Sequence, residues 1–147
     1  MTAPLVTVAD TCDAGFVALL SDGLDRGILD ATGVVDDTPL AVQAHDPDTG
    51  RVLGGISAHT SLGLLFIDLF YLPPELRGSG LGSAMLARAE AEGRRRGCRT
   101  GVLYTINFQA PAFYARHGWR TFGEIPSEPP GTYRVFMTKT LDDTPDA

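Results

Sequence analysis

Residues 77–83 read Arg-Gly-Ser-Gly-Leu-Gly-Ser, and this glycine-rich stretch decides how the rest of the sequence is interpreted. It follows an apolar run at residues 64–72 and opens a segment rich in Ala, Leu, Glu and Arg at residues 80–96. The two flanks predict a buried strand, then a tight turn, then a helix that ends at Gly97. The first N–H groups of a helix lack partners within it, and the helix dipole favours an anion beside them. Together with the guanidinium of Arg77, the turn is expected to bind phosphate.

Two common phosphate motifs do not fit this turn. A P-loop needs a lysine after its last glycine, and the chain has no lysine near residue 82. A dinucleotide-binding turn needs a third glycine at position 83, which is a serine here, and it follows the first strand of its domain. A glycine turn that only lets the chain fold tightly remains an alternative at this point.

A second motif lies at residues 107–119, which read Asn-Phe-Gln-Ala-Pro-Ala-Phe-Tyr-Ala-Arg-His-Gly-Trp. With the pattern Arg-x-x-Gly-x-Gly at residues 77–82, this stretch resembles the two signature motifs of the GNAT superfamily of N-acetyltransferases. The second signature, N-x-x-A-x-x-[FL]-Y-x-[KR]-x-G-[FW], is matched at every specified position. The lead-in at residues 68–77 is also similar to the family's approach to its loop, so the resemblance covers residues 50–122.

The resemblance implies an α+β fold with a mixed, mostly antiparallel central sheet of six or seven strands. The fourth and fifth strands are expected to splay apart, and three or four helices to flank the sheet. We expect one domain over residues 1–141 and a disordered tail over residues 142–147. Apolar periodicity and turn signals predict strands at 4–9, 39–45, 51–60, 64–72, 100–105, 119–125 and 132–141, and helices at 14–31, 80–96 and 110–117.

By similarity to the family, acetyl-CoA is expected to lie where the fourth and fifth strands separate. The end of the fourth strand would pair with the pantetheine arm, and the glycine-rich turn would hold the pyrophosphate. Asn107 would bond the arm, Phe113 would pack on it, and Arg116 would lie near the adenosine phosphates or on a solvated helix face. The cofactor-binding residues that the resemblance implies are Phe70, Tyr71, Leu72, Arg77, Gly78, Ser79, Gly80, Leu81, Gly82, Ser83, Asn107, Phe113 and Arg116.

The resemblance also implies direct transfer of an acetyl group to a primary amine of a small molecule, peptide or protein. Tyr114 matches the tyrosine that commonly protonates the sulfur of coenzyme A, or it is only a packed aromatic residue. Asp68 lies four residues before Leu72, and strand alternation predicts that both share a face. A carboxylate desolvated among apolar side chains is our candidate general base. A structural aspartate, a base acting through water and no base at all are the alternatives, and Glu75 is a weaker candidate. The histidines add little, although His59, at the end of a strand, is placed where it could face the acceptor cleft.

The charge of the chain is unevenly distributed. The net charge of −6 combines −9 over residues 1–76, +6 over residues 77–120 and −3 over residues 121–147. The basic segment coincides with the motifs and suits an anionic cofactor. The acidic remainder is expected to attract a cationic amine acceptor, or it is ordinary solubilising charge. The acidic balance argues against nucleic acid as a partner.

Composition excludes several other classes. Two cysteines, Cys12 and Cys98, do not form a disulfide framework, and no zinc-binding spacing occurs, so no metal is expected. We see neither a signal peptide nor an apolar run long enough to span a bilayer. The sequence therefore predicts a cytoplasmic protein without a membrane partner, and it leaves a homodimer open. A non-catalytic module that binds coenzyme A, and an acyltransferase that uses another acyl-CoA, are the alternative functions.

Overall fold

The computed structural model describes residues 2–142, so the expected tail lies outside the described residues except for Asp142. The chain contains two compact units, Met1–Val35 and Asp36–Ala147, which are described here one at a time. The first unit contains helix α1 (Ala14–Thr32), and the second contains the whole sheet.

In the first unit, α1 confirms the helix predicted at residues 14–31. Asp13 is its N-cap, because its Oδ1 accepts a hydrogen bond of 2.8 Å from the N–H of Phe16. The helix ends at Gly33, which has a positive φ of 77° and donates its N–H to the carbonyl of Leu29. The strand predicted at residues 4–9 is wrong, because this segment pairs with no strand in the described structure. Its β-branched residues favour extended backbone, but a strand forms only with a partner.

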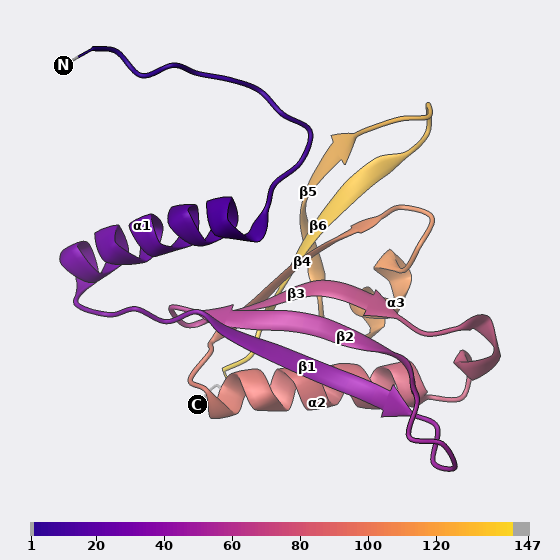
Figure 1. Cartoon of the computed structure of the whole chain (residues 1–147). Helices are drawn as coiled ribbons and strands as arrows, with labels where there is room; N and C mark the ends of the chain where they lie inside the picture. Colours follow the sequence, from indigo (N-terminus) through magenta and orange to yellow (C-terminus); the bar gives the residue numbers. More distant parts are fainter. Residues whose placement is uncertain (1, 143–147) are drawn as a thin grey trace. The chain divides into compact units, whose positions relative to one another are not determined.

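The second unit is built on a six-stranded mixed sheet (Figure 1). Its strands lie in the order β1-β2-β3-β4-β6-β5, and only the neighbours β3 and β4 are parallel. The expected α+β fold with a mostly antiparallel sheet is confirmed. The strands are β1 (Thr38–His45), β2 (Val52–Ser61), β3 (Leu64–Tyr71), β4 (Thr100–Ile106), β5 (Arg120–Pro126) and β6 (Tyr133–Thr140), and the helices are η1 (Pro74–Leu76), α2 (Leu81–Arg95) and α3 (Pro111–Arg116).

Strands β3 and β4 separate soon after they begin. They pair only at Leu64 with Thr100, Leu65 with Gly101 and Phe66 with Val102. Beyond Phe66, the edge of β3 that faces β4 has no neighbouring strand to bond. The splay expected between the fourth and fifth predicted strands is therefore confirmed, and in the structure it lies between β3 and β4.

Helix α2 covers one face of the sheet (Figure 1) and supplies part of the core. Leu81, Met85 and Ala89 are spaced four residues apart on one face of α2; Met85 and Ala89 are buried, whereas Leu81 is only partly buried. The helix packs closely on β3 at Gly93, where an added Cβ would lie 3.1 Å from Cδ2 of Leu65. The missing side chain of Gly93 therefore lets α2 lie close to β3 near the C-terminal end of the helix.

A buried carboxylate ties α2 to the end of the chain. Glu90 is 4% exposed, and its Oε1 lies 2.6 Å from Nζ of Lys139 on β6. Its Oε2 accepts a hydrogen bond of 3.2 Å from the indole N–H of Trp119, which follows α3. A buried charge is tolerated only when it is paired in this way. The pair therefore holds α2, α3 and β6 together around the core.

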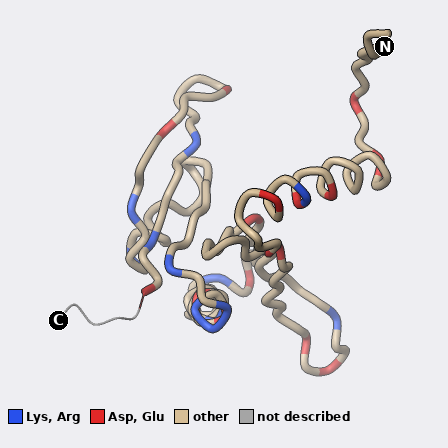
Figure 2. Tube along the Cα trace, turned by 90° about the vertical axis from the view of Figure 1, so that its left-hand side faces the viewer, with Lys and Arg blue, Asp and Glu red and all other residues tan. Residues whose placement is uncertain are grey.

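Basic residues gather at α2, and acidic positions recur along α1 (Figure 2). At the end of α2, Arg95 and Arg96 hydrogen-bond Glu92 and lower the pKa of its carboxyl to about 2. Arg96 also donates to the backbone carbonyls of Thr38 and Pro39. These arginines lie at the negative end of the helix dipole, far along α2 from the glycine-rich turn, and serve the fold rather than the phosphate site.

Candidate active site

A cleft of about 890 Å³ occupies the space where β3 and β4 separate. Its floor comes from the second halves of these two strands, and one end is closed by the glycine-rich turn and α3. It contains twelve of the fifteen residues that the sequence nominated for the site. These are Asp68, Phe70, Tyr71, Leu72, Arg77, Gly78, Gly80, Gly82, Ser83, Phe113, Tyr114 and Arg116.

The glycine-rich turn exposes its backbone to the cleft. Gly78 and Gly80 have φ angles of 82° and 88°, a left-handed conformation that residues with a Cβ rarely adopt. A Cβ added at either position would meet no atom within 4 Å, so the space above the turn is open. Gly80 is also the N-cap of α2, without a side chain to cap it. The first N–H groups of α2 therefore remain available to an anion.

Arginines supply positive charge around the turn. Arg77 donates Nε–H to the carbonyl of Leu72 at 2.7 Å, and its guanidinium carbon lies 5.9 Å from the ring centroid of Tyr71. These contacts fix the side chain and leave the terminal nitrogens without a hydrogen bond among the described residues. Arg116, at the end of α3, lines the same cleft. Both arginines therefore lie beside the glycine-rich turn, for which phosphate binding stays a prediction.

Tyr114 is held by aromatic packing at the edge of the cleft. Its ring meets Phe113 and Trp119 edge to face, with centroids 5.3 Å and 6.1 Å apart. Burial raises the pKa of its hydroxyl to about 12. The hydroxyl has no hydrogen-bond partner among the described residues, and no fully buried side-chain oxygen of these residues is unpaired. It must therefore reach open space, and Tyr114 lines this cleft.

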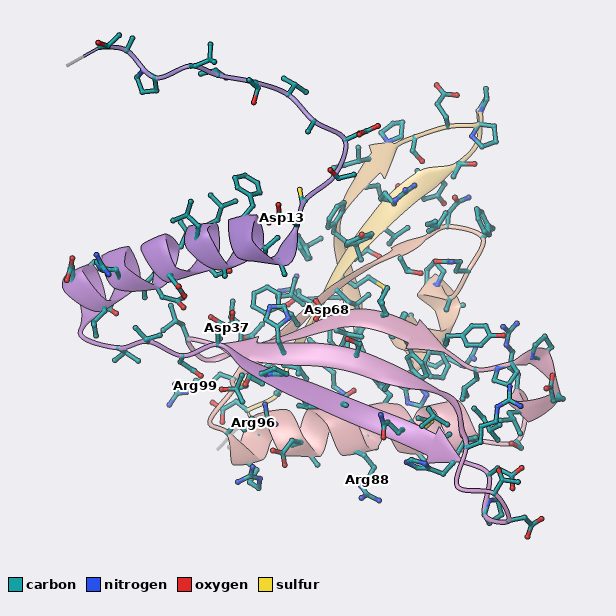
Figure 3. The ribbon with its side chains drawn as sticks, in the orientation of Figure 1. Asp13, Asp37, Asp68, Arg88, Arg96 and Arg99 are labelled. Atoms are coloured by element: carbon teal, nitrogen blue, oxygen red, sulfur yellow. The ribbon has the colours of Figure 1, made fainter. Side chains whose placement is uncertain are left out.

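A bulge in β3 changes the position expected for Asp68. Strand β2 pairs Ala58 with Ile67 and then Ser57 with Leu69, so Asp68 is an extra residue on β3. The expectation that Asp68 and Leu72 share a face is wrong, because the bulge reverses the alternation between them. Leu72 is buried in the core on the α2 side, whereas Asp68 lies on the opposite side of the sheet (Figure 3).

The surroundings of Asp68 are also more polar than expected. Its side chain is 42% exposed, so it is not desolvated among apolar neighbours. Its Oδ2 lies 2.7 Å from Nδ1 of His59 on β2. The second half of β3 is accordingly not buried on both faces, since Leu69 and Tyr71 are also exposed.

Three nominated residues do not line the cleft. The side chain of Ser79 donates to the carbonyl of Leu76 at 3.5 Å, and Leu81, the first residue of α2, lines a separate pocket between α2 and β1. Both polar atoms of the Asn107 side chain form hydrogen bonds within the protein. Oδ1 accepts from the N–H of Tyr133, and Nδ2 donates to the carbonyl of Gly131. The structure thus places Asn107 as an anchor of the loop between β5 and β6.

Other residues of the cleft were missed by the sequence interpretation. Arg134 projects from β6, where its Nη1 donates to Oγ of Ser127 at 3.1 Å. Tyr104 and Gln109 line the cleft from β4 and the loop after it. Motif matching did not reveal them because they lie outside the signature positions, and only the sheet order brings β6 beside β4.

Two further observations concern classes of protein that the sequence disfavoured. Within residues 2–142, no group of three or more His, Cys, Asp or Glu side chains could hold a metal ion. Among the helices of that same part of the chain, none is both long and apolar enough to cross a membrane.

Comparison with known proteins agrees with this geometry. The family model described as "Acetyltransferase (GNAT) family" matches residues 16–119. Blasticidin-S acetyltransferase from Streptomyces morookaense is 39% identical over 113 residues, which is 75% of this chain and 83% of that protein. A solved structure from Agrobacterium tumefaciens, assigned as an acetyltransferase, has a TM-score of 0.85 and 29% identity, covering 93% of this chain and 99% of its own.

One further solved structure carries a ligand. A Bacillus anthracis (strain Ames) protein assigned as a streptothricin acetyltransferase was solved in complex with acetyl coenzyme A. Its TM-score is 0.61 at 16% identity, and the match covers 71% of this chain and 64% of that one, so it shows a shared fold. The match to the family model and the similarity to the Streptomyces relative show that the chain belongs to the GNAT family of acetyltransferases.

Proposed function

We propose that this protein transfers the acetyl group of acetyl-CoA directly to a primary amine of a small molecule. The observation that carries the proposal is the cleft between β3 and β4, which joins an open phosphate-binding turn to the hydroxyl of Tyr114. Acyl transfer from this donor needs both the phosphate-binding turn and the hydroxyl, because acetyl-CoA is an elongated anion whose thioester lies far from its phosphates.

The residues present fit such a donor. The N–H groups at the start of α2, with Arg77 and Arg116, suit a pyrophosphate. The β3 edge beyond Phe66 has no neighbouring strand, so its backbone groups are free to pair with the amides of a pantetheine arm. The volume of about 890 Å³ lies within the range of ligand clefts.

The nominated residues outside the lining have supporting roles in this proposal. Ser79 and Leu81 contribute through the backbone of the glycine-rich turn. Asn107 supports the site by holding Tyr133, which precedes the cleft residue Arg134. These assignments distinguish residues that would touch the cofactor from residues that shape the cleft.

Acetyl-CoA supplies an activated thioester when it is bound. A backbone N–H near Leu72 polarises the carbonyl, and Tyr114 donates a hydrogen bond to the sulfur. Thiols ordinarily titrate near pH 8.5, well below the pKa of about 12 for Tyr114. The phenol therefore stays protonated and stabilises a developing thiolate mainly as a hydrogen-bond donor. Asp68 places a carboxylate on the acceptor side of the cleft and attracts an ammonium group.

A cationic antibiotic amine is the acceptor class to test first. The Streptomyces relative is named for blasticidin S, and the match covers most of both chains. We therefore expect blasticidin S, or another small amine with an additional positive charge, to be acetylated. The similarity to an enzyme named for an antibiotic favours a small-molecule acceptor over a lysine side chain of a protein.

The experiment is a screen of the purified protein with acetyl-CoA and a panel of amines, with release of free thiol as the readout. The panel includes blasticidin S, aminoglycosides, polyamines and a lysine peptide. We expect amine-dependent thiol release and a product heavier by one acetyl group in mass spectrometry. Tight binding of coenzyme A in calorimetry without any acetylated amine would instead support a non-catalytic module. Faster turnover with succinyl-CoA or malonyl-CoA would identify another donor.

A further inference from the structure

His59 and Asp68 form a side-chain pair that the family motifs do not include. Nδ1 of His59 lies 2.7 Å from Oδ2 of Asp68, and the His59 ring stacks on Phe66 with centroids 4.7 Å apart and planes 5° from parallel. The imidazole is therefore fixed both in its plane and by its Nδ1 hydrogen bond. It sits on β2, one strand away from the cleft that Asp68 lines.

The hydrogen bond determines which nitrogen of the ring is available. An ionised carboxylate only accepts hydrogen bonds, so Nδ1 must carry the proton that is shared with Asp68. Nε2 then holds the lone pair of the neutral ring. Nε2 has no partner among the described residues, and the His59 side chain is 34% exposed. The arrangement thus presents one free, oriented, proton-accepting nitrogen.

The bulge in β3 explains why this pair forms beside the cleft. As the extra residue of the bulge, Asp68 lies on the face of Phe66 and His59, opposite α2 (Figure 3). The phosphate-binding turn belongs to the α2 side of the sheet. The glycine-rich turn and the His59–Asp68 pair therefore lie on opposite faces, with the splay between β3 and β4 between them. An amine that is deprotonated near the pair approaches the splay from the side opposite the donor.

We propose that His59 is the general base for the acceptor amine and that Asp68 is the positioning residue that orients its ring. This inference rests on the proposed acetyl transfer. In model peptides imidazole titrates near pH 6.5 and carboxylic acids near pH 4, so imidazole is the better proton acceptor at neutral pH. The arrangement resembles a catalytic His–Asp pair, in which the carboxylate keeps the proton on Nδ1 of the neutral ring and stabilises the imidazolium once it forms.

The step balances as follows. The acceptor ammonium gives one proton to Nε2, and its nitrogen forms a C–N bond to the acyl carbon. The C–S bond breaks, and its electron pair goes to sulfur. The second proton of the nitrogen goes to the leaving thiolate, which the Tyr114 hydroxyl stabilises by a hydrogen bond until the thiol forms. His59 then releases its proton to solvent, so each turnover yields an amide, a thiol and one proton.

Few other charged groups surround His59. Asp68 is the charged group on β3, and Asp36 and Asp37 precede β1, where Asp36 accepts from the N–H of Leu62 in the turn after β2. On the opposite face of β2, Arg96 from α2 donates to the neighbouring Thr60. A pH profile must therefore be compared between variants that leave these groups unchanged.

The test uses His59→Asn, whose amide still donates to Asp68 from the place of Nδ1 but offers no basic nitrogen. His45→Asn is the matched control, because His45 lies at the far end of β1 and bonds only the carbonyl of Gly50. The readouts are kcat/KM for an acetylated amine between pH 5.5 and 9.5, and the Kd of acetyl-CoA. His59→Ala with added imidazole tests chemical rescue.

We expect His59→Asn to lower kcat/KM by about 100-fold at pH 7. The deficit should shrink as the pH rises, because more of the free amine forms without a base. The Kd of acetyl-CoA should stay within about twofold, His45→Asn should keep full activity, and imidazole should restore part of the His59→Ala rate.

A His59→Asn variant with the wild-type kcat/KM would overturn this inference and leave the proposed function intact, since a donor to Asp68 would then suffice. A loss that is equal at all pH values, without rescue by imidazole, would also overturn it. A wild-type protein that acetylates no amine would overturn the proposed function, and this inference with it.

Discussion

Replacing Tyr114 with phenylalanine removes one hydroxyl and keeps the packing of the ring. The contacts with Phe113 and Trp119 are made by the ring, so they persist in the variant. The hydroxyl has no protein partner to leave unsatisfied, and we expect the free energy of unfolding to change by less than about 1 kcal/mol at neutral pH. Turnover should fall by about 100-fold, equivalent to about 2.7 kcal/mol in the activation barrier. We place the effect at the low end for a general acid because the pKa of about 12 limits complete proton transfer.

The assay is steady-state thiol release, with the Kd of acetyl-CoA measured separately by calorimetry. Tyr133→Phe is the matched control, because Tyr133 is only partly buried and does not line the cleft. We expect the control to keep its turnover and both variants to bind acetyl-CoA within about twofold of the wild type. Unchanged turnover in Tyr114→Phe would refute the role of the hydroxyl. A large loss of cofactor affinity would refute our reading of the packing.

Three other outcomes follow from the geometry. Gly80→Asp should weaken coenzyme A binding at least tenfold in calorimetry, because it adds a negative charge to the glycine-rich turn. The control Gly80→Ala has the same unfavourable φ but no carboxylate, and should weaken binding much less. Equal losses of affinity in both variants would indicate backbone strain rather than charge. Gly101→Ala should destabilise the fold by about 2 kcal/mol in urea unfolding, because its Cβ would lie 2.5 Å from the Trp119 ring. In the control Gly123→Ala the new Cβ meets no atom within 4 Å, and the free energy of unfolding should not change. Because burial raises the pKa of Tyr114 to about 12, ionisation of this residue favours the unfolded chain between pH 10 and pH 12. Wild type and Tyr114→Phe should therefore be about equally stable below pH 10, and in urea unfolding the wild type should lose roughly 3 kcal/mol relative to the variant by pH 12.

The parts of the fold that the sequence predicted are those determined by local patterns. Helix α1 begins after its N-cap Asp13, because capping depends on residues within one turn of the helix end. Gly78 and Gly80 indicated a backbone that only glycine adopts readily, and both have positive φ angles. The spacing of the two motifs predicted a splayed sheet through the resemblance, and the ladder of β3 and β4 ends at Phe66.

The errors arose where pairing between distant residues decides the outcome. Strict alternation along β3 predicted the wrong face for Asp68, because a bulge depends on how β2 pairs with it. The segment at residues 4–9 has the composition of a strand, but composition does not provide a neighbour. Asn107 matches its motif position, and its side-chain amide bonds residues 24 and 26 positions further along the chain, which sequence spacing does not reveal; its contact with the pantetheine arm stays a prediction.

The measurement that tests the account most directly is a crystal structure of the protein with acetyl-CoA. We predict that the pyrophosphate accepts hydrogen bonds from the backbone of residues 77–83 and that the pantetheine arm pairs with the free edge of β3. The sulfur should lie within hydrogen-bonding distance of the Tyr114 hydroxyl. Acetyl-CoA bound outside the splay of β3 and β4, or with its sulfur remote from Tyr114, would contradict the account.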